Sequence, residues 1–202
     1  MFVCIEGFDV VGKTTLVSAL HQRVQKSGRR AVTYSFPRYH TRLGMVIDTW
    51  LKDGRALTMP EAFQAMMSAD KLEAGAEVQD LLEYGNVVIS SRYWQSAVVY
   101  GANSGVDPEM LWKMHRGSPL PNLNILLDMD VRTALARRPD KRDAYEKNPS
   151  FLEGVRERYL KLWAEPPEES KKSAHWSIVD ASQPQEKVEE DVWNLMETKP
   201  WL

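Results

Sequence analysis

The chain has 202 residues, of which 43% are hydrophobic and 27% are charged, and its formal net charge is −2. This length and composition fit a single globular domain over residues 1–202 with a full hydrophobic core. The nearly balanced charge argues against a protein that coats nucleic acid, because such a surface needs an excess of lysine and arginine.

The sequence also gives no sign of export or of a membrane anchor. No stretch approaches the ~18 apolar residues of a membrane span, and the N-terminus lacks the basic and apolar regions of a signal peptide. The single cysteine, Cys4, lies in an apolar run, so we expect it in the core and expect a reducing compartment. We therefore predict a cytoplasmic protein without membrane partners.

The first predicted strand, residues 2–5, leads into the sequence Gly-Phe-Asp-Val-Val-Gly-Lys-Thr at residues 7–14. This is the G-x-x-x-x-G-K-[ST] pattern of a phosphate-binding loop, set between a buried strand and an amphipathic helix. The glycines let backbone N–H groups converge on a phosphate, Lys13 adds positive charge, and the Thr14 hydroxyl can hold Mg²⁺. The pattern predicts that nucleoside triphosphate phosphates bind to Gly7, Phe8, Asp9, Val10, Val11, Gly12, Lys13, Thr14 and Thr15.

Asp9 is unusual inside such a loop, because a carboxylate would repel phosphates. It needs a contact with Mg²⁺, with an arginine or with a sugar hydroxyl, and we interpret it as a substrate contact.

Strand-like and helix-like segments alternate along the rest of the chain. Further strands are predicted at residues 31–36, 86–91, 123–129 and 176–179. Helices are predicted at residues 14–26, 43–51, 58–83, from 108 onward, 131–138, 150–163 and 185–197. Capping boxes at Thr58–Glu61 and Ser150–Glu153 are expected to begin two of the helices. The alternation predicts an α/β fold of the P-loop NTPase type, with three layers: a five-stranded parallel sheet and helices on both faces.

Arginine and aromatic residues follow two of the predicted strands. One strand ends in Phe36-Pro37-Arg38-Tyr39, and another is followed by Arg92, with Ser96 and Tyr100 on the next helix. An aromatic ring can stack on a base and an arginine can bind a phosphate through two hydrogen bonds, so the pattern predicts a second nucleotide site. The alternative is that the rings belong to the core and the arginines are solvated.

Residues 137–147 form a highly charged segment with five basic side chains. Phosphoryl transfer needs positive charge on the moving group and exclusion of water, so we interpret this segment as a short mobile lid. A solvated run of charges is the alternative interpretation.

Together these residues resemble the thymidylate kinase family of nucleoside monophosphate kinases. The resemblance spans nearly the whole chain and is carried by residues 6–15, 36–39, 69–71, 92–93, 142–146 and 179–182, with Ser96 and Tyr100. It implies transfer of the γ-phosphoryl group of ATP, with Mg²⁺, to a deoxynucleoside 5′-monophosphate, with dTMP as the first choice. The partners it implies are small-molecule nucleotides and a second copy of the chain in a homodimer.

The resemblance also implies roles for the matching residues. Lys13 and the loop backbone hold the ATP phosphates, and Thr14 and Asp9 lie at the metal. Phe36 stacks on the acceptor base, while Tyr39 and Arg92 bind the acceptor phosphate. The acceptor side as a whole comprises Asp9, Phe36, Arg38, Tyr39, Met67, Lys71, Arg92, Ser96, Tyr100 and Tyr145.

The catalytic charge is implied to come from several cationic side chains. The phosphate loop carries no arginine of its own, so the lid must supply one. The implied catalytic residues are Lys13, Arg92, Arg138 and Arg142.

Three positions depart from the family pattern, and all lie on the acceptor side or its metal. Ser91 stands where the family has an aspartate, Lys71 where it has an arginine that reads the pyrimidine, and Met67 where it has an aromatic residue. These changes leave open a kinase for another or a modified deoxynucleotide, such as a modified dUMP. A non-catalytic nucleotide-binding module is the alternative from a different class. A kinase of deoxynucleosides would need a carboxylate after the second strand, where the chain has Phe36.

Overall fold

In a computed structural model of the chain, the described residues are 1–137, 148–171 and 175–198. Five parallel strands form one sheet in the order β2-β3-β1-β4-β5. The strands are β1 Phe2–Glu6, β2 Ala31–Ser35, β3 Val87–Ser91, β4 Leu123–Asp128 and β5 His175–Asp180. This arrangement confirms the predicted fold, and no predicted strand end differs by more than about one residue.

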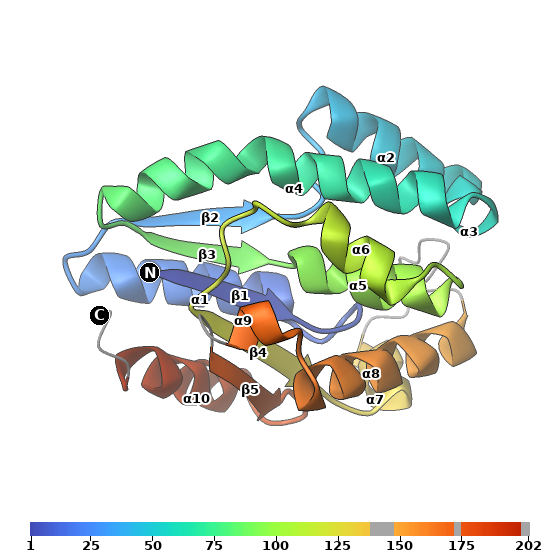
Figure 1. Cartoon of the computed structure of the whole chain (residues 1–202). Helices are drawn as coiled ribbons and strands as arrows, with labels where there is room; N and C mark the ends of the chain where they lie inside the picture. The colour runs from blue at the N-terminus through green and yellow to red at the C-terminus, as the bar shows by residue number, and fades with distance from the viewer. Residues whose placement is uncertain (138–147, 172–174, 199–202) are drawn as a thin grey trace.

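Helices cover both faces of the sheet (Figure 1). Their bounds are α1 Lys13–Lys26, α2 Arg42–Asp53, α3 Arg55–Thr58, α4 Pro60–Glu83, α5 Trp94–Asn103, α6 Pro108–Met114, α7 Val131–Arg137, α8 Pro149–Ala164, α9 Glu168–Lys171 and α10 Gln185–Glu197. Helix α1 packs on β1, β2 and β3 and meets α10, whereas α4 packs on β3 and α8 on β4 and β5. Figure 1 shows α2, α3 and α4 over the β2 side of the sheet, and α8 and α10 over the β5 side.

Strand β1 shows how the two faces are filled. Val3 and Ile5 belong to the apolar cluster that contains the buried face of α1, whereas Phe2 and Cys4 belong to a second cluster with Trp94 of α5. All four β1 side chains are fully buried, as expected for a central strand of a parallel sheet. The prediction that Cys4 is a core residue is confirmed, and its thiol is free.

Both predicted capping boxes are wrong. Helix α4 begins at Pro60 after Met59, with no side-chain cap, and Thr58 ends the short helix α3. Helix α8 begins at Pro149, and the side chain of Asn148 accepts a hydrogen bond from Phe151 N at 3.1 Å. Proline fits the first turn of a helix, where its missing N–H costs nothing, and this preference set both helix starts.

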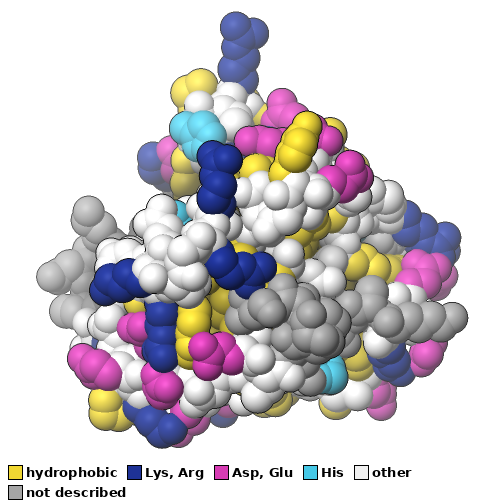
Figure 2. All heavy atoms as spheres, turned by 90° about the vertical axis from the view of Figure 1, so that its left-hand side faces the viewer, with side chains coloured by type: hydrophobic (Ala, Val, Ile, Leu, Met, Phe, Trp, Pro, Cys, Tyr) yellow, Lys and Arg dark blue, Asp and Glu magenta, His cyan; other side chains and the backbone are white. Residues whose placement is uncertain are grey.

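The surface around the amino ends of the strands carries lysine and arginine interspersed with aspartate and glutamate (Figure 2). This face shows no broad patch of one sign. Within the described ranges, no helix combines the length and the apolar character that a bilayer crossing requires.

Candidate active site

The phosphate-binding loop connects β1 to α1 at the carboxyl edge of the sheet. Gly7 has φ of 140°, and a Cβ there would lie 2.7 Å from the carbonyl oxygen of Leu127, so only glycine fits against β4. Gly12 has φ of 97° and precedes the first turn of α1. Lys13 Nζ donates to Gly7 O at 2.9 Å and to Phe8 O at 2.7 Å. The loop thus presents a helix N-terminus and a lysine to the same edge of the sheet.

Three cavities lie in a row along this edge. The first, of about 290 Å³, lies between α1 and the start of α10, and the second, of about 440 Å³, lies over the phosphate loop. Gly12, Thr15 and Arg137 line both of them. The third, of about 70 Å³, reaches α4 and α5 and shares Asp9 and Arg92 with the second. The loop therefore stands between two pockets that open onto a common centre.

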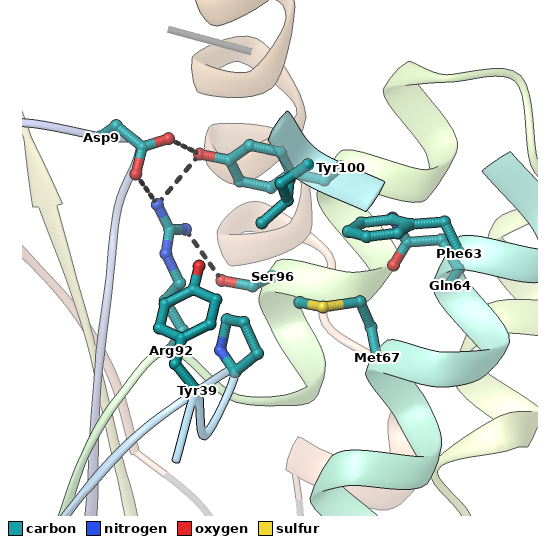
Figure 3. Close-up of a pocket in the computed structure, with 10 residues that line it drawn as sticks. Asp9, Tyr39, Phe63, Gln64, Met67, Arg92, Ser96 and Tyr100 are labelled. Carbon is teal, nitrogen blue, oxygen red and sulfur yellow. Dashed lines mark hydrogen bonds and ion pairs between the residues drawn. The ribbon is translucent and has the colours of Figure 1, made fainter. Parts of the chain in front are cut away.

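Arg92 is the central cation of the acceptor side. It follows β3 with φ of 65°, which is rare for a residue other than glycine and turns its side chain toward the phosphate loop. Its guanidinium pairs with Asp9, donates to Ser96 Oγ at 3.1 Å and to Tyr100 Oη at 3.2 Å, and reaches Gly7 O at 3.2 Å. Figure 3 shows the contacts of Arg92 with Asp9, Ser96 and Tyr100, which bring four of the predicted site residues together.

Asp9 is bonded through both of its oxygens. One accepts from Arg92 and the other accepts from Tyr100 Oη at 2.8 Å. Burial by itself would raise the pKa of Asp9, but the charges of Arg92 and Lys13 outweigh it and hold that pKa below its ordinary value. Asp9 therefore stays ionised and positions Arg92, and its predicted contact with the metal stays a prediction.

Glu6 is a site residue that the sequence analysis missed. It is fully buried, accepts from the backbone N–H groups of Tyr93 and Ser96 at 2.7 and 3.2 Å, and accepts from the hydroxyls of Ser96 and Tyr159 at 2.6 and 2.7 Å. This carboxylate thereby holds the start of α5 in place and orients the Ser96 hydroxyl, which Arg92 contacts. The signals for it in the sequence were a carboxylate at the end of an apolar strand and its place in the stretch 6–15 that resembles the family.

Three of the predicted acceptor residues are buried in the core, and two of them, Arg38 and Lys71, line none of the three cavities. Arg38 Nε pairs with the buried Asp70 at 2.9 Å, so this arginine joins the turn after β2 to α4. Lys71 is fully buried and its Nζ donates to Met67 O at 2.8 Å. Phe36 touches the wall of the second cavity but is 2% exposed and is stacked on Tyr34, with ring centres 5.9 Å apart. The position of Phe36 therefore agrees with the alternative interpretation, in which the ring belongs to the core.

The remaining predicted residues are distributed as follows. Tyr39 lines both the second and the third cavity, Thr14 lines the second, and Met67 lines the third. Arg138, Arg142 and Tyr145 lie outside the described residues. Their assigned roles stay predictions.

Two residues of α4 that line the third cavity were not predicted, and the first residue of the predicted lid, Arg137, lines the other two cavities. Phe63 and Gln64 of α4 line the third cavity one turn before Met67. Arg137 lines the first and second cavities, and its guanidinium donates to Ala181 O at 2.8 Å and to Ser182 O at 3.0 Å. The i, i+4 spacing between Phe63 and Met67 was the available signal, because it places both on one face of a helix.

This geometry defines a class of protein. A phosphate-binding loop on the central strand, with one pocket on each side of it and an arginine at the centre of the second, is the arrangement of a P-loop kinase that transfers a phosphoryl group between two nucleotides. The thymidylate kinase family model matches residues 5–192 of the chain. The chain belongs to the thymidylate kinase family, and its enzyme class is that of the nucleoside monophosphate kinases.

Individual relatives agree with this assignment. A probable thymidylate kinase of Pyrobaculum aerophilum is 32% identical, over 96% of this chain and 95% of the relative. A probable thymidylate kinase of Methanosphaera stadtmanae is 33% identical, over 80% of this chain and 83% of the relative. The solved structure of the thymidylate kinase from Candida albicans is 23% identical and shares the fold, with a TM-score of 0.82 over 98% of this chain and 91% of that chain.

Proposed function

We propose that this chain transfers the γ-phosphoryl group of ATP to dTMP, forming dTDP and ADP. The observation that carries the proposal is the row of three cavities, in which Arg92 and the loop that bears Lys13 line the same central space. The adenosine of ATP occupies the first cavity, its phosphates occupy the second, and the acceptor enters from the third. Because little covalent help is needed, positioning and electrostatic stabilisation carry the reaction.

The positive charges are divided between the two substrates. Lys13 binds the β- and γ-phosphates of ATP, while Arg92 and Tyr39 bind the acceptor phosphate. The lid arginines Arg138 and Arg142 bind the charge that spreads over the transferring group. An arginine in this role is worth about 10³–10⁵ in rate.

Mg²⁺ would be held mainly by the ATP phosphates and water, with the Thr14 hydroxyl as the protein ligand. Asp9 is bonded to Arg92 and Tyr100, Ser91 offers no carboxylate, and the described residues contain no cluster of three or more potential metal-binding side chains. The proposal requires that a chelator abolish turnover and that added Mg²⁺ restore it. Turnover that persists in excess chelator would contradict it.

The acceptor is tested by a coupled assay of ADP formation with dTMP, dUMP, dCMP, dGMP, dAMP and 5-substituted dUMPs. We expect dTMP to rank first. The buried Lys71 and the flexible Met67 favour a modified dUMP as the second candidate, and a modified dUMP far above dTMP would establish that alternative. ATP binding without ADP formation from any acceptor would establish a non-catalytic module.

The role of Arg92 is tested by replacing it with alanine. Arg92→Ala should lower kcat by about 10³-fold or more while changing the ATP dissociation constant little, because the side chain serves the acceptor and the transition state. Arg116→Ala is the matched control, since Arg116 is exposed and pairs with Glu169 at 3.2 Å away from the cavities. An unchanged kcat in Arg92→Ala would remove Arg92 from the mechanism. The same comparison applies to Arg138→Ala and Arg142→Ala.

We also propose that the enzyme acts in the cytoplasm as a homodimer, without nucleic acid. Met45 and Val46 of α2 and Leu72 of α4 are 54%, 45% and 44% exposed, and a second copy of the chain would cover them. The face around the amino ends of the strands carries charges of both signs and shows no broad basic patch for nucleic acid (Figure 2). Sedimentation at micromolar concentration should give twice the chain mass, and a monomer mass would overturn the dimer.

A further inference from the structure

The third cavity contains a buried polar group that the proposed mechanism does not use. Gln64 of α4 lines this cavity, is 1% exposed, and its Oε1 atom has no hydrogen-bond partner among the described residues. Figure 3 shows the side-chain oxygen of Gln64 directed to the space between α4 and the Arg92 and Tyr100 side chains. A buried carbonyl oxygen without a hydrogen bond destabilises the fold, so its partner is expected to be a ligand.

Packing holds Gln64 in this orientation. A Cβ on Gly101 of α5 would lie 2.9 Å from Gln64 Cγ and 2.6 Å from Leu111 Cδ1. The absence of a side chain at position 101 therefore makes the room in which Gln64 lies. One turn further along α4, Ser68 Oγ donates to the main-chain carbonyl of Gln64 at 2.8 Å, so this bond leaves the side-chain oxygen unpaired. The buried Gln64 side chain therefore packs between α4 and α5 rather than in solvent.

The surroundings of Gln64 indicate what kind of group binds there. Phe63, Met67 and Leu51 supply apolar walls, and Tyr100 and Arg92 close the end of the cavity that faces the phosphate loop. An apolar slot with one unpaired acceptor fits a flat ring that carries an N–H donor. The thioether of Met67 can change rotamer to admit such a ring.

We propose that Gln64 Oε1 accepts a hydrogen bond from the ring N3–H of the acceptor base and so selects thymine or uracil over cytosine, whose neutral ring has no hydrogen on N3. This inference rests on the proposed function and names a residue that determines its base specificity. A site that hydrogen-bonds one substrate rejects an analogue that lacks the donor, because the buried protein group is then left unpaired.

The test compares two proteins on two acceptors, dTMP and 3-methyl-dTMP, in which a methyl group replaces the N3 hydrogen. In the wild type, kcat/KM for dTMP should exceed that for 3-methyl-dTMP by roughly 10–100-fold. In Gln64→Met the dTMP value should fall by a similar factor, and the ratio between the two acceptors should approach one. Dissociation constants of the two monophosphates, measured by calorimetry, should follow the same pattern.

Two controls separate the possible failures. Gln64→Met keeps the length of the side chain and removes the unpaired buried Oε1 together with the amide nitrogen, so its Tm should equal or exceed that of the wild type. If Gln64→Met lowers activity on both acceptors by one factor, or leaves the ratio unchanged, Gln64 does not read N3 and the inference is overturned. If the wild type phosphorylates no monophosphate at all, the proposed function fails instead.

Discussion

Lys71 is an ammonium group enclosed on the acceptor side of the core. It is fully buried, its Nζ lies 5.6 Å from the centre of the Phe36 ring, and its Nζ donates a hydrogen bond to Met67 O. Burial lowers the pKa of Lys71 from 10.5 to about 8, against the attraction of Asp70 and Glu6. The cost of holding this charge inside the protein is therefore largest at and below neutral pH.

This shift predicts a stability that rises with pH. The unfolded chain holds the lysine proton up to a pKa near 10.5, and the folded protein releases it near 8, so the Lys71 contribution to the free energy of unfolding increases between these values. Relative to Lys71→Met, the wild type should gain about 2 kcal/mol between roughly pH 7 and pH 9.5. Urea unfolding of both proteins at the two pH values measures this gain. A difference that does not change with pH would show that Lys71 titrates normally.

Asp9 marks the limit of what the sequence revealed about single residues. Its place in the loop was evident, and its need for a metal, an arginine or a sugar hydroxyl followed from charge alone. The choice of Arg92 depends on β3 lying next to β1 and on the φ of 65° at Arg92, neither of which can be derived from local sequence. Motif and charge thus located the residue, and tertiary structure chose its partner.

At the scale of elements, helix α2 begins directly against the turn that follows β2. Thr41 caps the helix, with its Oγ1 accepting from Gly44 N at 3.0 Å and donating to Arg38 O at 3.0 Å. A Cβ on Gly44 would lie 2.0 Å from Arg38 O and 2.9 Å from Tyr39 Cα. The helix therefore approaches the turn as closely as it does only because residue 44 is glycine.

Gly44→Ala should consequently disturb both stability and the acceptor side. The added methyl group must push α2 away from the turn, which should lower the free energy of unfolding by roughly 1–3 kcal/mol and raise the KM for the acceptor, because Tyr39 moves. Gly75→Ala is the matched control within α4, since its Cβ would lie at 3.5 Å from Pro119 Cδ, an ordinary contact. That variant should be as stable as the wild type or up to about 1 kcal/mol more stable. Denaturant unfolding and acceptor kinetics of the two variants test this prediction. Equal changes in stability and in acceptor KM for Gly44→Ala and Gly75→Ala would contradict it.

Elements were predicted well where one local signal dominated, and badly where two signals competed. The strands are short apolar runs bounded by turns, and their ends were placed closely. The start of α4 offered both a Thr58–Glu61 capping box and Pro60, and the proline decided it. At α8, likewise, Asn148 and Pro149 set the start in place of Ser150. Which of these signals sets the first residue of a helix depends on the path of the preceding chain. That path is fixed by tertiary packing and cannot be derived from local sequence.

At the scale of the whole molecule, equivalent sequence patterns had different outcomes. Arg38 and Arg92 both follow a strand of the parallel sheet, and both were assigned to the acceptor. Arg38 turns to the buried Asp70 of α4, whereas Arg92 turns to Asp9 of the phosphate loop. Sheet topology predicts that strand ends meet at one edge. Which side chains face each other there depends on the helices packed above. The location of the site was therefore predicted better than the ion pairs within it.

The row of cavities makes a prediction for the molecule as a whole. An adenosine and a thymidine joined through their 5′-oxygens by a chain of phosphates would occupy all three cavities at once, so the second nucleoside binds without a further loss of translational freedom. At about 100 times its dissociation constant, such a ligand stabilises the fold by about 2.7 kcal/mol, or roughly 5–10 °C in Tm for a chain of this length. A thermal melt should therefore show a larger Tm rise with the joined compound than with ATP and dTMP together, each at the same concentration as the joined compound.

Arg92→Ala should reduce the additional Tm rise given by the joined compound, whereas Arg116→Ala should leave it unchanged. If the joined compound raised Tm no more than ATP alone, the cavities would not form one continuous site, and the two nucleotides would not meet above the phosphate loop.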